Sequence, residues 1–419
     1  MDSFWRFFRL DLSYLIKGGA WTSLSFVVGT LASLVTMVAF GNLLPRETFG
    51  TYNYLLSLGA SLSFLTLSGV GPAVMRAVAR GYENVVPTAL RIELKWNLLA
   101  VATISAVAVY YGYRGNFLFC FSLLLLTLAY PVAEAFHIYK SVLTGQRRFK
   151  ILTQITSVIS IVGAFITVLV LFFTDNILIL IGVYSLMTLV PNMIVYRLLA
   201  RRIDQAKPDE EQIAEMRRSA FHFTGAGVIG VIASYIDKIV LFQAAGPSAL
   251  AVYGFALAGP DRLKSLIKNW GSIALPRLAG KSLGQIRAVV YKHIGFSLLV
   301  GAGLSFIYWF AAPPLFKIFL PRYLDAIFYS QVMTLGLIVV PVSVYIGLIF
   351  TSQNMLKAMY TLNFGNHLAR ITLFVVFGYL WQTWGLVAAS ILSSLINAVY
   401  SLLIWEVEAR RLIKIQQNN

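Results

Sequence analysis

The residues of this sequence that are best suited to chemistry are charges inside an apolar segment. Asp261, Lys264 and Lys268 are spaced three and four residues apart, and Arg262 adjoins them, all within a predicted membrane span at 253–275. This spacing places side chains on one face of a helix. Charged groups inside a bilayer are costly and by default indicate a functional site. Because lysine and arginine bind phosphate and carboxylate groups, this face predicts a site for an anionic ligand.

A second charged pair lies in the preceding predicted span, at 220–245. Asp237 and Lys238 stand as far from one end of their span as Asp261 and Arg262 stand from the corresponding end of the next. Because consecutive spans run antiparallel, these side chains are expected at similar depth. We therefore predict two ion pairs, Asp237–Arg262 and Lys238–Asp261.

Three cations would then keep uncompensated charge: Lys264, Lys268 and Arg370, the last in a predicted span at 359–380. This is the composition of a cavity for an anionic group, with all seven charges lining it. Two other interpretations stay open. The charges could hold helices together, or 253–275 could be an amphipathic helix on the cytoplasmic surface.

The predicted span at 117–142 contains a proline. Pro131 is expected to kink this helix and to free a backbone carbonyl. One turn later, Glu134 is either a proton or cation coupling site or a carboxylate paired with Lys140.

A histidine accompanies one of the cations. His367 lies three residues before Arg370 and shares its helical face, so it is either a proton shuttle or a packing histidine. Together with Glu134 and Asp237 it completes the set of candidate ion-coupling residues. A proton and a sodium ion both stay open as the coupling ion.

Basic residues also end two predicted spans. Arg76 and Arg80 follow one span, and Arg277 and Lys281 follow another. They either anchor the chain to anionic lipid headgroups or form the cytoplasmic mouth of the cavity.

Twelve apolar runs must position these residues. The chain has 419 residues, of which 58% are hydrophobic and 12% are charged, far fewer charges than a soluble domain carries. A short interfacial helix is expected at 3–16. The predicted spans are 19–44, 52–75, 96–113, 117–142, 151–173, 177–199, 220–245, 253–275, 290–312, 326–352, 359–380 and 384–405.

The basic residues fall almost entirely on one side of these spans. Of 34 lysines and arginines, 25 lie at or between alternate span ends and only four at the opposite ends. By the positive-inside rule, both termini are expected to be cytoplasmic. The same rule explains the net charge of +17, so nucleic acid is not expected as a partner.

The two halves of the chain resemble each other. With a shift of 201 residues, Arg76 aligns with Arg277 and Arg80 with Lys281. An even number of spans per half makes this a parallel repeat about an axis along the membrane normal. We predict an all-α fold of two six-helix lobes, at 1–200 and 219–419, joined by a cytoplasmic linker at 201–218.

Several classes of site are disfavoured. The four histidines are scattered, and Glu134 and His137 lack the second Glu-x-x-His motif that a carboxylate-bridged metal site needs, so no metal is expected. Neither a phosphate-binding glycine loop nor a Ser-His-Asp arrangement is present, and no enzymatic activity is expected.

Motifs throughout the chain resemble one family. They are Leu43–Tyr52, Ser68–Arg76, Tyr235–Leu241, Val252–Gly254 and Ala274–Leu278. Together they are similar to the Wzx-type polysaccharide flippases, members of the multidrug/oligosaccharidyl-lipid/polysaccharide (MOP) exporter superfamily, which includes the MATE transporters.

This resemblance implies a two-lobed transporter in the cytoplasmic (inner) membrane with a central cationic cavity and no cofactor beyond a coupling ion. It implies that the cargo is an undecaprenyl-diphosphate-linked oligosaccharide, moved from the cytoplasmic to the outer leaflet by alternating access. The implied partners are membrane lipids, a polysaccharide polymerase and chain-length proteins, for a polymer such as O-antigen or exopolysaccharide.

Two rival functions stay open at this point. A drug exporter of the MATE type would carry cations, and acidic residues would then prevail in the cavity. An integral-membrane polysaccharide polymerase or glycosyltransferase would carry a large outer loop, whereas the predicted outer segments are all short.

Overall fold

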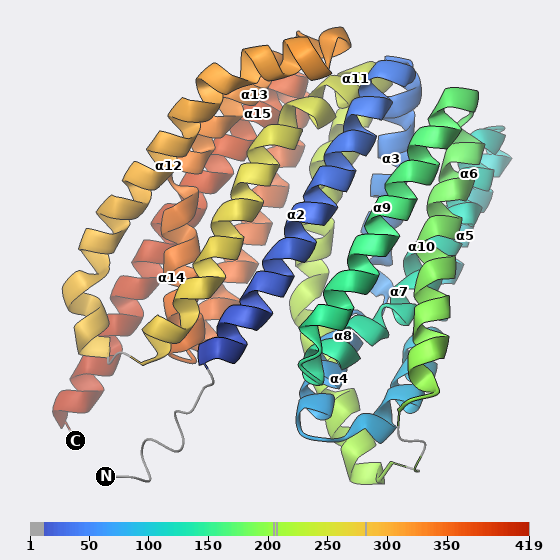
Figure 1. The fold of residues 1–419 in the computed structure, drawn as a ribbon. Coiled ribbons are helices and arrows are strands. Elements are labelled where there is room, and N and C mark those ends of the chain that lie inside the picture. Colours follow the sequence, from blue (N-terminus) through green and yellow to red (C-terminus); the bar gives the residue numbers. More distant parts are fainter. Residues whose placement is uncertain (1–11, 204–205, 207, 281–282, 419) are drawn as a thin grey trace. The chain divides into compact units, whose positions relative to one another are not determined.

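The computed structural model describes the chain except for residues 1–11, 204–205, 207, 281–282 and 419. Of residues 12–18, 226, 270–277, 279 and 412–418 it describes only the backbone. The described chain is helical, without strands, and it forms two compact units (Figure 1). The first unit comprises Met1–Leu44 and Leu62–Val228, and the second comprises Pro45–Ser61 and Ile229–Asn419.

The first unit contains eight of the assigned α-helices and the opening turns of α11. These helices are α2 (Leu12–Leu43), α4 (Val70–Ala79), α5 (Val86–Tyr113), α6 (Phe117–Thr127), α7 (Ala133–Phe136), α8 (Ile138–Gly145), α9 (Phe149–Phe173) and α10 (Ile177–Ala200). Short 3₁₀ turns at Ser63–Leu65 and Glu83–Val85 and a π-helical turn at Leu128–Val132 connect some of them.

Asparagine side chains cap the N-termini of two helices of the first unit. Asn116 Oδ1 accepts a hydrogen bond from the Phe119 amide at 3.1 Å, and Asn176 Oδ1 accepts one from the Leu178 amide at 2.9 Å. Each satisfies a backbone donor that has no partner within its helix. These caps fix the residues at which α6 and α10 begin.

The second unit contains α3 (Arg46–Leu62), the remainder of α11 (Glu210–Ala279), α12 (Leu283–Phe319), α13 (Ala326–Thr334), α14 (Val340–Ser352) and α15 (Leu356–Asn418). Its inner core gathers buried side chains from α11, α12, α14 and α15, among them Ile286, Ile346, Phe350 and Trp405. Gly301 on α12 allows close packing there, because a Cβ atom would lie 2.4 Å from the Ile338 carbonyl oxygen.

Two long helices are interrupted, and each therefore counts as two. Gly246 (φ 82°) divides α11 into a first part, 210–245, and a second part, 247–279, and Gln382 (φ 52°) divides α15 in the same way. In the described chain, eight helices are long and apolar enough to span a membrane, and ten if each of two bent pairs is one span. The interruptions divide two of these helices further, and the described chain confirms the predicted all-α membrane fold.

The backbone at Gln382 is strained, because a residue with a Cβ atom disfavours positive φ. Replacing Gln382 with glycine is expected to raise the thermal unfolding midpoint, through a gain of about 1 kcal/mol. Gln382→Ala is the matched control, since alanine keeps the Cβ atom and should bring no gain. Equal midpoints for the glycine and alanine variants, measured on the purified protein, would contradict this account.

The span predicted at 52–75 is not one helix. α3 ends at Leu62, and α4 begins only at Val70. The intervening backbone is held by side chains instead: Thr66 Oγ1 donates to the Ser63 carbonyl at 2.8 Å, and Thr224 Oγ1 accepts from the Gly69 amide at 2.9 Å. The apolar run alone did not reveal these polar contacts, so the segment predicted as one span is a pair of helices bent by 61°.

The units also differ from the predicted domains at 1–200, 201–218 and 219–419. Residues 45–61 group with the second unit, and the later boundary lies after Val228. The predicted linker is helical from Glu210 onward, because α11 starts there. α2 already includes residues 12–16 of the predicted interfacial helix at 3–16, and the rest of that segment lies outside the described residues.

Candidate functional site

The second part of α11 carries Asp261, Arg262, Lys264 and Lys268, and it lies within the second unit. Asp261 and Lys264 form an ion pair at 3.7 Å. Lys264, predicted to lack a counter-charge, is therefore the partner of Asp261, and the predicted pair Lys238–Asp261 is not among the ion pairs of the described residues. A separation of three residues on one helix brings these two side chains together more directly than a contact between helices.

Three of the predicted residues line one hollow of about 190 Å³ in the second unit: Lys238, Asp261 and Arg262. Its other lining residues are Asn53, Gly254, Leu257, Ala258 and Ser265. We call it the charged hollow. Its lining residues come from α3 and from both parts of α11. Its polar groups include two cations and one carboxylate. This arrangement suits an anionic group with additional hydrogen-bonding oxygens.

Asn53 was not predicted as a site residue, because α3 carries several other polar side chains and nothing in its spacing sets Asn53 apart. Gly254 allows a close approach of the two helices there, since a Cβ atom at this position would lie 2.9 Å from Asn53 Nδ2. Asn53 therefore offers an amide to the same ligand that the cations attract.

Tertiary contacts hold α3 within the second unit. The Tyr54 ring stacks on Phe242 with ring centroids 3.9 Å apart, and a Cβ atom on Gly50 would lie 1.9 Å from the Pro247 carbonyl oxygen. At the start of α3, Arg46 forms an ion pair with Asp325 at 2.8 Å.

The aromatic residue beside this ion pair is Tyr323, and the Arg46 guanidinium lies 5.0 Å from its ring centroid. Burial raises the pKa of Tyr323 to about 12, although the nearby Arg46 opposes the rise. Tyr323 is thus neutral at physiological pH and contributes an apolar ring face to the anchorage of α3.

Asp237 lies inside the second unit and not at the surface of a cavity. Its side chain is 3% exposed, and its Oδ2 accepts a hydrogen bond from the Tyr253 hydroxyl at 3.0 Å. The prediction had instead paired Asp237 with Arg262. Its other oxygen, Oδ1, has no hydrogen-bond partner in the structure. A buried acceptor without a partner is costly, which keeps Asp237 a candidate for binding a proton or a cation.

Lys268 lines a different hollow, of about 260 Å³, between the second part of α11, α14 and α15. Most of its lining is apolar: Val344, Gly347, Leu348, Phe350, Met359 and Leu362, with Thr351 and Asn363. The predicted cations therefore do not share a single cavity wall. Lys268 is instead a cation at an apolar crevice, a combination that suits an amphipathic ligand.

Arg370 and His367, both on α15, interact electrostatically with the lysines of the second part of α11. Arg370 and Lys268 both act electrostatically on Lys264 and on His367. Arg370 Nε is buried without a hydrogen-bond partner, and its guanidinium lies 5.1 Å from the Phe374 ring centroid.

His367 packs against the first part of α11, since a Cβ atom on Gly230 would lie 3.0 Å from its Nε2. Five cations and two carboxylates thus gather in the second unit, with a formal excess of three positive charges. The cations are Lys238, Arg262, Lys264, Lys268 and Arg370, and the carboxylates are Asp237 and Asp261.

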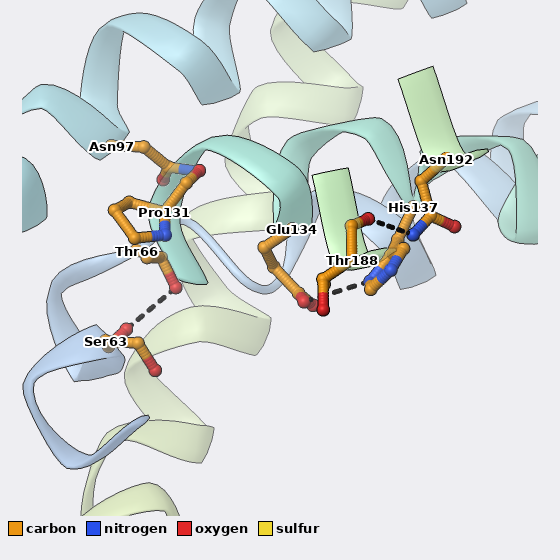
Figure 2. Close-up of polar contacts among 8 residues, drawn as sticks. All are labelled: Ser63, Thr66, Asn97, Pro131, Glu134, His137, Thr188 and Asn192. Carbon is orange, nitrogen blue, oxygen red and sulfur yellow. Dashed lines mark hydrogen bonds and ion pairs between the residues drawn. The ribbon is translucent and has the colours of Figure 1, made fainter. Parts of the chain in front are cut away.

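The first unit has a polar cluster of its own, shown in Figure 2. His137 Nδ1 and Glu134 Oε2 lie 3.0 Å apart, so the partner of Glu134 is His137 and not Lys140 as one interpretation had it. These two side chains lie near Thr188 and Asn192 of α10, against which α7 packs. Asn192 Oδ1 is buried without a hydrogen-bond partner.

Asn97 on α5 connects this cluster to the interrupted segment between α3 and α4. Its Nδ2 donates to the Pro131 carbonyl at 2.7 Å, and Figure 2 shows these two residues side by side. Its Oδ1 accepts from the Leu67 amide at 3.0 Å. Pro131 lies in the π-helical turn, so the predicted distortion is present. Asn97 and the neighbouring buried Glu93, which repels Glu134 electrostatically, were both missed in the sequence.

The basic residues predicted at the cytoplasmic mouth are described only in part. Arg80 forms an exposed ion pair with Glu215 at 2.6 Å, and Arg76 and Arg80 line the same small hollow. The Arg277 side chain and Lys281 lie outside the described residues. Exposed pairs of this kind contribute little to stability.

No group of three histidine, cysteine, aspartate or glutamate side chains suited to a metal ion is found in the described part of the chain.

The chain matches a known protein family in sequence and known transporters in structure. A family model described as "Polysaccharide biosynthesis protein" matches residues 15–258. The search of curated proteins found no match.

Among solved structures, an inward-facing multidrug resistance MATE family transporter of the MOP superfamily has a TM-score of 0.71 and is 14% identical, over 92% of this chain and 96% of that one. Its outward-facing counterpart has a TM-score of 0.64 at 14% identity, over 96% of each chain.

A third similar structure is a MOP superfamily transporter from Pyrococcus furiosus Vc1 (DSM3638), reported with a binding pocket of reversed polarity. Its TM-score is 0.59 at 14% identity, over 96% of this chain and 95% of that one. These identities establish a shared fold, and the family match covers more than half of the chain. The protein is therefore a membrane protein with the two-lobed MOP transporter fold, and it belongs to the polysaccharide biosynthesis protein family.

Proposed function

We propose that the protein is a flippase that moves an undecaprenyl-diphosphate-linked oligosaccharide from the cytoplasmic to the outer leaflet of the cytoplasmic membrane. The observation that carries this proposal is the excess of positive charge in the second unit of a polysaccharide-family transporter. A diphosphate that enters hydrocarbon loses its hydration at a large free-energy cost, and fixed cations around a hydrated hollow offset most of it.

The charged hollow and the apolar crevice at Lys268 suit different parts of this ligand. In the charged hollow, Lys238, Arg262 and Asn53 offer donors to phosphate oxygens and to sugar hydroxyls. At the apolar crevice, Lys268 places a cation beside an apolar wall, where a phosphate and the start of a polyprenyl tail can lie together. The rest of the tail can stay in lipid.

The direction of transport rests on the distribution of charge. With both termini cytoplasmic, as the basic residues indicate, the lipid-linked precursor is taken from the leaflet on which it is made. A polymerase and chain-length proteins would then use the precursor on the outer side. Alternating access of the two lobes is the mechanism that fits this fold.

The excess of cations argues against export of cationic drugs, since a cationic ligand would be repelled. The short connections argue against a polymerase or glycosyltransferase. Among the described connections on the predicted outer side, those after α5, α9 and α12 comprise only residues 114–116, 174–176 and 320–325.

Deletion of the encoding gene, followed by lipid analysis, tests the proposal. A flippase null should accumulate diphosphate-linked oligosaccharide on the cytoplasmic leaflet. Display of short units on the outer leaflet in that strain would refute the flippase function and would indicate a polymerase.

We place ion coupling at the Glu134–His137 pair, with Asp237 and His367 as the other candidate groups. Glu134→Gln removes a titratable carboxylate, and we expect at least a tenfold lower rate of precursor translocation, about 1.4 kcal/mol in activation free energy. The rate would be measured in proteoliposomes with an imposed proton or sodium gradient.

Glu215→Gln is the matched control, because Glu215 is a carboxylate in an exposed pair with Arg80. It should leave the gradient response unchanged. A Glu134→Gln variant that responds to both gradients as the wild type does would exclude coupling at Glu134.

A further inference from the structure

A third hollow in the second unit has a different chemical character. Its volume is about 350 Å³, at the small end of the range of roughly 300–1,000 Å³ typical of ligand pockets. It is lined by Ala249, Val252, Asp325, Phe328, Tyr329, Thr383 and Trp384, which come from the second part of α11, from the start of α13 and from the α15 segment after Gln382. We call it the aromatic hollow.

Trp384 is the central aromatic group of this hollow. Its ring centroid lies 4.7 Å from that of Tyr329 and 5.6 Å from that of Phe328, with interplanar angles of 59° and 69°. Neither ring lies flat on the indole, and Trp384 and Phe328 remain 46% and 54% exposed. Aromatic ring area is therefore left open at the hollow.

A fixed carboxylate stands beside these rings. Asp325 accepts hydrogen bonds from both terminal nitrogens of Arg46, at 2.8 and 3.1 Å. A carboxylate has about four acceptor positions, so Asp325 can still accept bonds from a ligand while Arg46 holds it in place. The Thr383 hydroxyl adds a group that can both donate and accept.

This combination selects a class of ligand. A sugar ring has a face of C–H groups, which the negative face of an aromatic ring attracts, and a rim of hydroxyls, which a carboxylate binds well. Since Arg46 already neutralises Asp325, the hollow offers no excess cation to an anionic headgroup, and a hydrocarbon chain would make no use of its polar groups. The hollow therefore favours a neutral sugar ring.

The backbone around the hollow is unusual as well. The helix interruptions at Gly246 and Gln382 lie within a few residues of the lining residues Ala249, Thr383 and Trp384. Strained backbone such as that at Gln382 is often associated with functional sites. By the charge distribution of the chain, these helix ends belong to the outer side of the membrane.

We propose that the aromatic hollow is a saccharide subsite that holds a sugar ring of the transported oligosaccharide on Trp384, with Asp325 and Thr383 binding its hydroxyls. This inference rests on the proposed flippase function. It assigns the diphosphate to the cationic groups and the sugar to a separate place at the outer end of the same unit.

Two lipids distinguish the subsite from the diphosphate site. Full-length protein in detergent would be titrated with undecaprenyl diphosphate and with the lipid-linked oligosaccharide extracted from a host that lacks this protein. The wild type should bind the sugar-bearing lipid about tenfold more tightly than the bare lipid. Trp384→Ala should lose this preference and keep the affinity for undecaprenyl diphosphate.

Trp381→Ala is the matched control. Trp381 precedes Trp384 by three residues and is 58% exposed, but it does not line the hollow. It should keep the tenfold preference. Equal losses in the two variants would identify both tryptophans as interfacial anchors and overturn the proposal. Trp384→Phe, which keeps a ring face, should retain part of the preference and guards against a folding defect in the alanine variant.

A second titration separates failure of the subsite from failure of the flippase function. The oligosaccharide is released from its lipid by mild acid and followed by saturation-transfer NMR, which needs no diphosphate. Signals in the wild type that disappear in Trp384→Ala support the subsite even if neither lipid binds. Unchanged signals in Trp384→Ala, or none in the wild type, overturn it, whereas weak binding of undecaprenyl diphosphate alone counts only against the cationic site.

Discussion

Replacement of both Arg262 and Lys268 by alanine is expected to stop export of the lipid-linked precursor. Each side chain offers a charge-assisted hydrogen bond worth about 1.5–3 kcal/mol to a phosphate. Loss of both should lower translocation by about 100-fold or more. The two residues line different hollows, so each single variant should be less severe than the double variant. Surface display of the polymer and accumulation of the precursor are the measurements.

Membrane insertion should survive this change, because removing charges from a spanning helix lowers its insertion cost. Lys292→Ala/Lys317→Ala is the matched control. It also removes two positive charges, both exposed on α12, one near each end of the helix, and so leaves the charge bias between the membrane faces unchanged. Normal polymer display by Arg262→Ala/Lys268→Ala, at normal protein levels, would refute the cationic site.

Replacement of Asn97 by alanine is expected to destabilise the first unit strongly. Asn97 is 1% exposed and bonds both the Leu67 amide and the Pro131 carbonyl. Without it, two buried backbone groups lose their partners, each at a cost of about 1–3 kcal/mol, so the total is about 2–6 kcal/mol. The thermal unfolding midpoint of the purified protein should fall clearly.

Thr103→Ala tests whether any polar deletion on α5 has this effect. Thr103 is half-buried and its hydroxyl makes an exposed hydrogen bond to the Leu99 carbonyl within the same helix, so its removal should change the stability by about 0.5 kcal/mol or less. Equal midpoints for the Asn97 and Thr103 variants would show that the contacts to Leu67 and Pro131 are not critical.

Some sequence predictions held because they depend on local properties. Long apolar runs must be helical in a membrane, since the bilayer offers no partner for backbone polar groups, and eight to ten such spans are found in the described chain. The single charged face of 253–275 follows from helical spacing, which brought Asp261 and Lys264 together. The π-helical turn at Pro131 follows from its missing amide hydrogen.

Other predictions failed because they required knowledge of which helices touch. Nothing local distinguishes the apolar residues of α3 from those of α4, yet 45–61 pack in the second unit and α4 in the first. For the same reason the hydrogen bond from the buried Tyr253 hydroxyl to Asp237 was not predicted.

The sequence by itself therefore determined the all-α membrane class and the clustering of charge, because these depend on burial and on spacing along one helix. Only the tertiary structure decided that Asn53 lines the charged hollow, that Lys268 lies at a separate crevice and that Asn97 ties Leu67 to Pro131. Such contacts depend on the close approach of particular helices, which is decided by side-chain volume and by glycines such as Gly254 and Gly50, and not by hydropathy.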